Sequence, residues 1–279
     1  MKPSEPGLTA LVAALRDVPR DLILVTTGAG ISLASGIPTF RGTDPDAVWK
    51  RDVTELATAR FFFEDPVESW RWYLQRFGNL LEKRPNPAHR ALVALERWQA
   101  ARGGDLLVVS QNVDTLHEQA GSRNLVKVHG RADRVRCSRV GCPNGAPKGS
   151  LPRAGCGEEA FRRDPGKATL PRCPACGSVL RQHVLLFDEC YDEHEDYQWE
   201  RVIAGATRAA VQLFVGTSFS VGVTDLVLNA ALLQGRPTFL IDPGLQSPAP
   251  GVTVIRDPAE EALPAVCAAL GVAVDAASV

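Results

Sequence analysis

The chain has 279 residues, of which 45% are hydrophobic, a size that suits one large domain, or one large domain with a small inserted one. Its 31 basic and 32 acidic residues leave a formal charge of -1, so composition gives no reason to expect a nucleic acid or a membrane surface as partner. The N-terminal segment lacks the apolar core of a signal peptide, and no apolar run reaches the roughly 18 residues of a membrane span. We therefore expect a cytoplasmic protein.

The first elements in chain order alternate between helix and strand. Leu8–Arg16 is predicted to be a short amphipathic helix, and Asp21–Thr27 a buried strand that ends in a glycine-rich turn. Two helices that meet near Asp65-Pro66 are expected between residues 52 and 84, since Pro suits the first turn of a helix. Pro87–Ala101 is predicted to be a further helix.

Further strands are predicted from short apolar, β-branched runs. They are Asp105–Ser110, Leu125–Val128, Val184–Phe187, Ala210–Gly216, Thr238–Asp242 and Val252–Ile255. Alternation with helices predicts an α/β fold, a Rossmann-like parallel sheet with helices on both faces. Between residues 131 and 181 the chain is rich in Cys, Pro and Gly, which is typical of a small metal-stapled module. We expect a Rossmann-like domain from 1–130 and 181–279, with a helical insertion at about 43–84, and a zinc-binding module from 131–180.

A short glycine motif, Gly28-Ala29-Gly30-Ile31-Ser32, directly follows the first strand. Such a turn lets the backbone approach a pyrophosphate, and the helix after it offers free N–H groups, but alone it equally fits a tight strand-to-helix turn. No acidic residue lies at the Rossmann distance downstream, which disfavours an ordinary dehydrogenase. The whole run, GAGISLASGIPTFRG, resembles the first signature of the sirtuin (Sir2) family, bacterial type.

That resemblance implies a set of NAD-binding residues at the turn. Gly28, Ala29, Gly30 and Ser32 would contact NAD, while Phe40 and Arg41 would shield and position its nicotinamide end. A bulky aromatic over a reactive sugar carbon would exclude water from an electrophilic intermediate.

Three polar residues follow the second strand, in Ser110-Gln111-Asn112-Val113-Asp114. Ligands bind outside the carboxyl ends of strands in such sheets, although these residues could equally be loop caps. The segment resembles the family motif TQNID. This resemblance implies that Asn112 and Asp114 hold the nicotinamide amide and the ribose, and that Gln111 contacts the nicotinamide ribose. It also implies a catalytic role for Asn112. By the same resemblance, Gly216, Thr217, Ser218 and Asp242 lie against the adenosine half of NAD.

His129 precedes Gly130 after the third strand, where the family carries its catalytic His-Gly. An imidazole with an unperturbed pKa near 6.5 suits a general base. The resemblance implies an NAD-dependent protein-lysine deacylase, a deacetylase and/or desuccinylase, in which His129 takes a proton from a ribose hydroxyl. The products would be nicotinamide, acyl-ADP-ribose and free lysine, and the partner an acylated lysine of a protein. The other four histidines are expected to be structural or surface groups.

Four cysteines form two knuckles, Cys137-x4-Cys142 and Cys173-x2-Cys176. Two such pairs suit a closed tetrahedral zinc site with a structural role. Cys156 lies between the pairs and is a potential substitute ligand.

Some residues expected to face the substrate match the sirtuin pattern, and others depart from it. Tyr73-x-x-Arg76 resembles the pair found in sirtuins that prefer succinyl, malonyl or glutaryl lysine, and Arg suits carboxylate capture; the alternative is an exposed helix face. Val184 and Phe187 stand in the segment that resembles the family's RP-x-VV-x-FGE. There Gln182 replaces Pro and Asp188 replaces Gly.

A second departure follows the Gly-Thr-Ser turn, where Val221-Gly-Val-Thr224 lacks the family's V-x-PA. Both segments clamp the substrate backbone in the family as an added strand. Their departures leave open an ADP-ribosyltransferase or NAD hydrolase on the same scaffold. A non-catalytic zinc-ribbon binding protein is disfavoured, because no basic cluster with interleaved aromatic residues is present. The sequence does not fix the oligomeric state.

Overall fold

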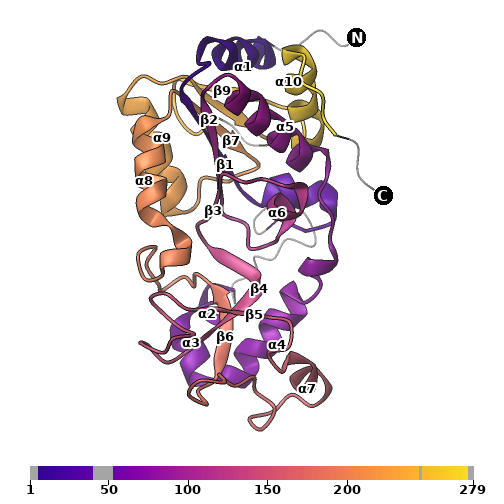
Figure 1. The fold of residues 1–279 in the computed structure, drawn as a ribbon, viewed down its shortest axis with the longest axis vertical. Coiled ribbons are helices and arrows are strands. Elements are labelled where there is room, and N and C mark those ends of the chain that lie inside the picture. Colours follow the sequence, from indigo (N-terminus) through magenta and orange to yellow (C-terminus); the bar gives the residue numbers. More distant parts are fainter. Residues whose placement is uncertain (1–5, 40–52, 245–246, 276–279) are drawn as a thin grey trace.

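The computed structural model describes residues 6–39, 53–244 and 247–275. The molecule is elongated, with a large sheet towards one end and a small sheet towards the other (Figure 1). Within these residues, no helix combines the length and apolar character that crossing a membrane requires.

The large sheet has six strands in the order β3-β2-β1-β7-β8-β9, and every neighbouring pair is parallel. Its strands are β1 (Leu22–Thr27), β2 (Asp105–Ser110), β3 (Leu125–Lys127), β7 (Val211–Val215), β8 (Thr238–Ile241) and β9 (Val252–Ile255). The strand order reverses between β1 and β7. In open α/β sheets, ligands bind outside the carboxyl ends of the strands at such a reversal.

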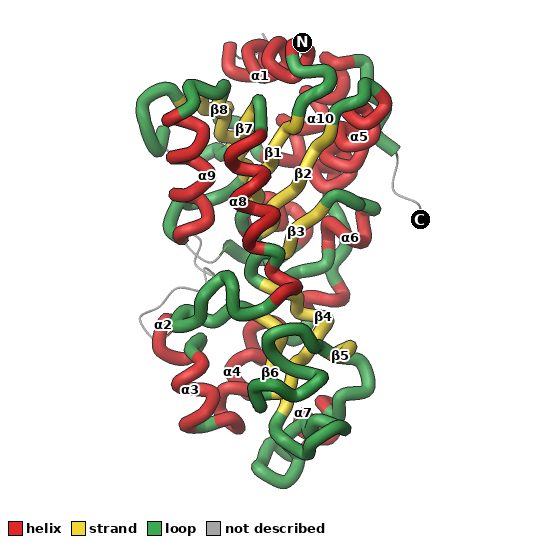
Figure 2. The backbone as a smooth tube through the Cα atoms, turned by 60° about the vertical axis from the view of Figure 1, so that its left-hand side comes forward, coloured by secondary structure: helices red, strands yellow, loops and turns green. Residues whose placement is uncertain are grey.

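Helices cover both faces of this sheet (Figures 1 and 2). One face packs against α1 (Pro6–Asp17), α5 (Pro87–Ala101) and α10 (Ala259–Leu270), and the other against α8 (Trp199–Arg208) and α9 (Gly222–Leu233). Successive strand residues serve opposite faces: Ile23 and Val25 pack with the first group of helices, and Leu24 packs with the second. The predicted α/β class is confirmed, and the buried apolar strand runs explain it.

The small sheet is antiparallel, with the order β5-β4-β6. Its strands are β4 (Gly130–Cys137), β5 (Leu151–Pro152) and β6 (Leu180–Val184), and the helices α2 (Val53–Leu56), α3 (Ala59–Glu64), α4 (Pro66–Phe77) and α7 (Glu158–Arg163) lie around it (Figure 1). The two helices predicted to meet at Asp65-Pro66 are α3 and α4. Pro66 opens α4, and the Asp65 side chain accepts the N–H groups of Val67 and Glu68.

The predicted strand Val184–Phe187 is wrong in both position and partner. The strand is β6, which ends at Val184 and pairs with β4 rather than with the parallel sheet. Beyond it the backbone changes partners, because the Leu185 N–H donates to the His129 carbonyl and the Phe187 N–H to the Ala57 carbonyl. The remaining short elements are the 3-10 helices η1 (Ala29–Ser35), η2 (Leu80–Glu82) and η3 (Glu195–Tyr197) and the helix α6 (Leu116–Ala120).

Candidate active site

The glycine turn after β1 packs backbone against backbone on the turn after β7. The Gly28 N–H donates to the Val215 carbonyl at 3.0 Å, and the Gly30 N–H to the Gly216 carbonyl at 2.9 Å. A Cβ on Gly28 would lie 2.6 Å from the Gly216 oxygen, and one on Gly30 2.6 Å from the Gly216 Cα. These N–H groups are therefore engaged by protein rather than free for a pyrophosphate, and the element that follows is the 3-10 helix η1 instead of an α-helix.

Side chains from the ends of β1 and β2 meet in a buried hydrogen-bond network. The Ser32 hydroxyl donates to Asp114 Oδ2 at 2.9 Å. The Asn112 amide donates to Ser32 Oγ at 3.1 Å and to the Gly28 carbonyl at 3.0 Å. Ser32, Asn112 and Asp114 are all buried. Residues from two separate motifs are thus held together at the edge of the sheet where the reversal lies.

Asp114 is anchored from two further directions. Its Oδ1 accepts the Leu116 N–H at 3.0 Å, at the start of α6. The ammonium of Lys127, at the end of β3, donates to the Asp114 backbone carbonyl at 2.6 Å. Lys127 is itself buried and lies 3.8 Å from the Glu118 carboxylate. The orientation of the Asp114 carboxylate is consequently set before any ligand binds.

Gln111 connects the ends of three adjacent strands. Its side-chain amide donates to Thr217 Oγ1 at 3.1 Å and to the Thr27 carbonyl at 3.2 Å. On the β7 and β8 side, Ser218 is exposed, and half-buried Asp242 accepts the Gly244 N–H on Oδ1 at 2.9 Å. The predicted cofactor-binding residues therefore line one edge of the sheet, where amide, hydroxyl and carboxylate groups suit the hydroxyl-rich ribose halves of NAD. Ala29 opens η1 beside them, and Phe40 and Arg41 lie outside the described residues.

His129 lies between the two sheets, immediately after Val128 and before β4. Its Nδ1 is 2.8 Å from the Gln111 carbonyl, which can only accept, so Nδ1 carries the proton and Nε2 the lone pair. Burial lowers the pKa of His129 to about 4, although one edge of the side chain stays partly exposed. The imidazole is therefore neutral at pH 7, the form that a general base requires.

The glycine after His129 has a steric cause. Gly130 has a φ of 81°, and a Cβ there would lie 2.2 Å from the His183 carbonyl oxygen on β6. A side chain would push the two strands apart. The His-Gly pair thus places the imidazole at the point where Gly130 of β4 pairs with Val184 of β6.

Tyr191 is a residue of this site that the sequence did not indicate. Its hydroxyl lies 3.4 Å from His129 Nε2, and the two rings stack with centroids 5.8 Å apart. The two residues are 62 positions apart in the chain, and no motif includes the tyrosine. Only the fold brings Tyr191 next to His129.

The four predicted zinc ligands form one cluster. Their sulfur atoms lie within 4.8 Å of one another, with Cys137 and Cys176 3.5 Å apart and Cys142 and Cys173 3.7 Å apart. Tetrahedral zinc–thiolate geometry, with Zn–S of about 2.3 Å, requires about 3.8 Å between sulfurs, so the donor set fits zinc. Cys156 is not part of the cluster.

The thiolate form is already favoured at one of these ligands. Hydrogen bonds from Ser178 lower the pKa of Cys176 to about 6, whereas burial raises that of Cys137 to about 12. All seven cysteines are free of disulfides, as expected of a metal site rather than an oxidised framework.

On the substrate side, Tyr73 and Val184 belong to one buried apolar cluster. It also contains Ala57, Trp72, Phe77, Leu80 and Ala132. Tyr73 is 3% exposed and its hydroxyl has no hydrogen-bond partner among the described residues, which excludes the exposed-face interpretation for this residue. Arg76 is half-buried, and Phe187 is 48% exposed. Thus Tyr73 and Val184 are brought together, and Phe187 lies outside their cluster.

Asp188, one of the departures from the family pattern, has a clear structural role. Its carboxylate accepts the Ala59 N–H at 2.6 Å and the Arg60 N–H at 3.0 Å, at the start of α3. The neighbouring Glu189 accepts two hydrogen bonds from Arg181, at 2.6 and 2.9 Å, and one from Arg136 at 2.7 Å. The loop after β6 is therefore tied to both α3 and the small sheet.

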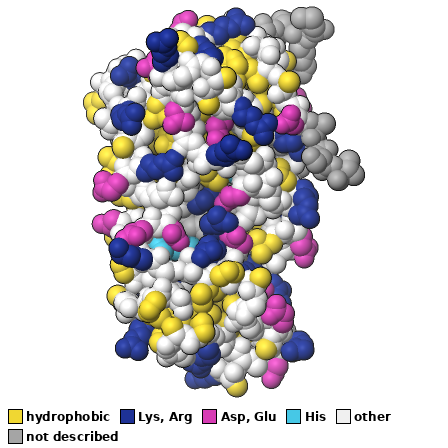
Figure 3. Space-filling view, viewed as in Figure 1, with side chains coloured by type: hydrophobic (Ala, Val, Ile, Leu, Met, Phe, Trp, Pro, Cys, Tyr) yellow, Lys and Arg dark blue, Asp and Glu magenta, His cyan; other side chains and the backbone are white. Residues whose placement is uncertain are grey.

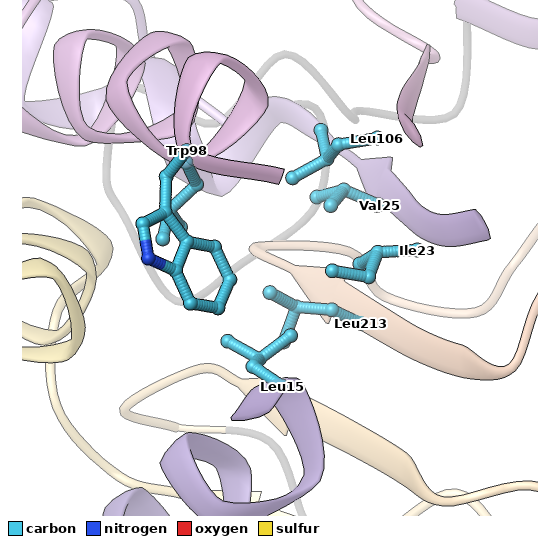
Figure 4. A pocket seen from close by; sticks show the side chains of 7 residues that line it. Leu15, Ile23, Val25, Trp98, Leu106 and Leu213 are labelled. Carbon is cyan, nitrogen blue, oxygen red and sulfur yellow. The ribbon is translucent and has the colours of Figure 1, made fainter. Parts of the chain in front are cut away.

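One hollow beside the large sheet lies apart from these polar residues. Figure 4 shows a small hollow whose lining is wholly apolar: Leu15, Ile23, Val25, Leu95, Trp98, Leu106 and Leu213. It offers no polar group to orient a ligand. The face shown in Figure 3 carries basic and acidic side chains interspersed, without a broad field of one sign.

Comparison with known proteins agrees with this geometry. The Sir2 family model matches residues 28–223. An NAD-dependent protein deacylase from Thermus thermophilus is 44% identical over 222 residues, 79% of each chain. NAD-dependent protein deacylase 1 from Pseudomonas aeruginosa is 36% identical over 244 residues, 87% of this chain and 91% of its own.

Solved structures show the same fold. A Sir2 homologue in complex with NAD superposes with a TM-score of 0.72 at 32% identity, covering 92% of this chain and 94% of its own. A mutant Sir2 homologue in complex with ADP-ribose gives a TM-score of 0.75 at 31% identity, covering 94% of this chain and 99% of its own.

Proposed function

The chain belongs to the Sir2 family of NAD-dependent protein deacylases, and from that premise we propose that it deacylates lysine side chains with His129 as the general base. It transfers the acyl group to the ADP-ribose part of NAD, with nicotinamide and free lysine as the other products. In this proposal residues 1–130 and 181–279 form the NAD-binding domain, and residues 131–180 the zinc-binding module.

The observation that carries the proposal is the fixed tautomer of His129. The Gln111 carbonyl accepts a hydrogen bond from the Nδ1–H group, and the Gln111 side chain in turn donates to Thr217, just after β7. The lone pair of Nε2 is then the group that accepts a proton from a ribose hydroxyl. The lowered pKa keeps that lone pair available at neutral pH.

The remaining residues bind and orient. Ser32, Asn112 and Asp114 form one pre-organised hydrogen-bond network, so little reorganisation is needed when the nicotinamide ribose binds. We assign Asn112 a catalytic role beside His129, because its amide is fixed by Gly28 and Ser32 at the reversal of strand order. Gly28, Ala29, Gly30, Gln111, Gly216, Thr217, Ser218 and Asp242, together with Phe40 and Arg41, complete the proposed NAD site.

The cysteine cluster would hold zinc in a closed four-thiolate site. Such a site supplies folding free energy and leaves no open position for a substrate. Its role is to keep β4 and β6 in place, since Cys137 ends β4 and Cys173 and Cys176 precede β6.

The acyl pocket is proposed to lie at Tyr73 and Val184, with Phe187 and Arg76 at its rim. The unpartnered Tyr73 hydroxyl is a donor in an apolar surrounding, and a carboxylate of an acidic acyl group would satisfy it. Arg76, one turn later on α4, supplies the opposite charge. This supports the removal of succinyl-type as well as acetyl groups.

The test is mass spectrometry of matched acetyl- and succinyl-lysine peptides incubated with NAD. Wild-type protein should yield free lysine peptide and the corresponding acyl-ADP-ribose, and His129→Ala should lose about 100-fold or more of the rate while still binding NAD. Full activity in His129→Ala would show that His129 is not the general base. Consumption of NAD with both peptides intact would point to NAD hydrolysis or ADP-ribosylation instead.

Acyl preference is tested with Arg76→Met. The variant should lose activity on the succinyl peptide and keep it on the acetyl peptide. Arg71→Met is the matched control, because Arg71 is an exposed arginine of the same helix. An equal loss on both peptides would contradict the acyl-selecting role.

A further inference from the structure

Tyr191 lies between two aromatic rings at the junction of the two sheets. Its ring stacks on Trp199, the first residue of α8, with centroids 4.3 Å apart and planes 12° apart, and its other neighbour is His129. The ring is half-buried and packs against the hydrophobic cluster between the large sheet and helices α8 and α9. Its position is therefore fixed by packing on both sides.

The polarity of the contact between Tyr191 and His129 follows from the tautomer. Because Nδ1 donates to the Gln111 carbonyl, Nε2 of the neutral ring can only accept, so the Tyr191 hydroxyl is the donor across the 3.4 Å. Burial raises the pKa of Tyr191, and the Val223 backbone N–H, which lies beside the same hydroxyl, acts in the opposite direction. Tyr191 thus joins the base to the first turn of α9.

The Val223 N–H is a group that the sirtuin pattern V-x-PA lacks at this position. Val223 stands where the sirtuin pattern V-x-PA has proline, and proline has no N–H to donate. Gly222, beside it, also lies next to the ring, since a Cβ there would be 3.9 Å from Tyr191 Cε2, an ordinary van der Waals distance. Two positions of the altered segment Val221–Thr224 therefore lie beside Tyr191.

We propose that the Tyr191 hydroxyl is a latch on the general base: it lies at Nε2 of His129, and the ribose hydroxyl of NAD must displace it before His129 can act. The inference rests on the proposed role of His129. Proton transfer requires the ribose hydroxyl at Nε2, and that is the position the Tyr191 hydroxyl takes. NAD then binds productively to the open fraction of the enzyme, and its apparent affinity is reduced by that fraction.

Tyr191→Phe is the direct test, because it keeps the ring stack and removes the hydroxyl. We expect the dissociation constant for NAD, measured by calorimetry, to fall about two- to tenfold, the factor that one neutral hydrogen bond carries. The KM for NAD should fall with it, and kcat should not decrease. An unchanged affinity, or a decrease in kcat at unchanged KM, would overturn the latch.

Tyr197→Phe is the matched control. Tyr197 lies on the same segment, and its hydroxyl accepts a hydrogen bond from Arg136 rather than contacting His129. Its loss should leave the affinity for NAD unchanged. The same tightening in both variants would mean that any loosening of the segment has this effect, and the proposal would fall.

Val223→Pro tests the other end of the latch by restoring the family residue. Proline is tolerated in the first turn of a helix, and Val223 is the second residue of α9. The variant should tighten NAD binding in the same direction as Tyr191→Phe, and the double variant should bind no more tightly than the stronger single one. Additive effects would contradict a shared hydroxyl.

A readout independent of turnover separates this proposal from the proposed function. Opening the latch unstacks Tyr191 from Trp199, so NAD should change the tryptophan emission of the wild type but much less that of Trp199→Phe. If wild-type protein binds NAD and deacylates no peptide, the proposed function is wrong, while the affinity ratio of Tyr191→Phe still decides the latch. NAD binding without any Trp199-dependent change would overturn the latch alone.

Discussion

The NAD edge of the large sheet and the substrate-side lobe around the small sheet hold their key residues by different means. At the NAD edge, backbone contacts between the turns after β1 and β7 fix the geometry, and amide and hydroxyl groups complete it together with the Asp114 carboxylate. In the substrate-side lobe, charged side chains make the decisive contacts, such as Asp188 on α3 and Glu189 on two arginines. The first kind of contact allows almost no other sequence, whereas the second depends on which side chains are present.

This difference explains why the family pattern is kept at one site and altered at the other. Gly28, Gly30 and Gly216 touch one another through backbone atoms, so any side chain there would collide. Asp188, by contrast, replaces a family residue and forms contacts of its own. We expect the chain to have kept its cofactor while its substrate-side lobe diverged.

Loss of the metal should have the largest effect and should be confined to the substrate-side lobe. Cys173→Ser, or removal of zinc by a strong chelator, leaves a lobe with a small apolar core and no staple, because structural zinc supplies on the order of 10 kcal/mol of folding free energy. We expect loss of about one zinc per chain, complete loss of deacylation and protease cleavage within residues 131–180. Zinc analysis and limited proteolysis measure these changes.

The matched control is Cys156→Ser, since Cys156 lies outside the four-sulfur cluster. It should keep its zinc and its protease resistance. Loss of zinc from this variant would mean that Cys156 is a ligand after all.

Glu189 should be the most costly single side chain to remove from the buried ionic network. Burial alone would raise the pKa of Glu189, but hydrogen bonds and charge from Arg181 outweigh it and lower the pKa. Glu189→Ala leaves two arginines, each 4% exposed, without their carboxylate. We expect a loss of about 3–5 kcal/mol in the free energy of unfolding, measured with denaturant. A loss below about 1 kcal/mol would show that water replaces the carboxylate.

The same contrast describes what the sequence could predict. The strands β1, β2, β3, β7, β8 and β9 are apolar runs, so their positions and the α/β class followed from pattern alone. β4 carries four charged residues among its eight, three of them arginines. It shows no apolar strand pattern, so the sequence alone does not predict it. The cysteine spacing predicted the metal cluster directly. Tyr191 could not be predicted, because its partners His129 and Trp199 are defined by the fold.

Acid should destabilise the NAD edge through two buried histidines: His117 Nε2 lies 3.1 Å from Thr27 Oγ1 at the end of β1, and His89 packs against the His117 ring. Burial lowers the pKa of His89 to about 4 and that of His117 well below its ordinary value. Since the unfolded chain takes up a proton near pH 6.5 and the folded chain resists it, stability is full above about pH 7 and falls as the pH drops towards 4. From pH 7.5 to pH 5, His89 alone accounts for about 2 kcal/mol.

The measurement compares denaturant unfolding at these two pH values in wild type and in His89→Gln, which removes one titrating group. The variant should be less stable at pH 7.5, where it loses the bond from the Asn86 N–H to His89, but should lose about 2 kcal/mol less on acidification. Parallel pH dependence in the two proteins would show that His89 protonates freely in the folded state.

The smallest expected effect bears most directly on the contrast between the two regions. Asp188→Gly restores the family residue and removes the acceptor for the Ala59 and Arg60 N–H groups, which should cost about 1 kcal/mol of stability, as for other helix caps. If the departure also serves the substrate site, the KM for the acyl-lysine peptide should rise while the Kd for NAD stays constant, because the loop after β6 loses its tie to α3. Asp188→Asn keeps an acceptor oxygen, so its stability and its KM for the peptide should lie between those of the wild type and Asp188→Gly. A change in NAD affinity as large as the change in peptide KM would mean that the two regions are coupled, and that the independence of their contacts does not extend to their function.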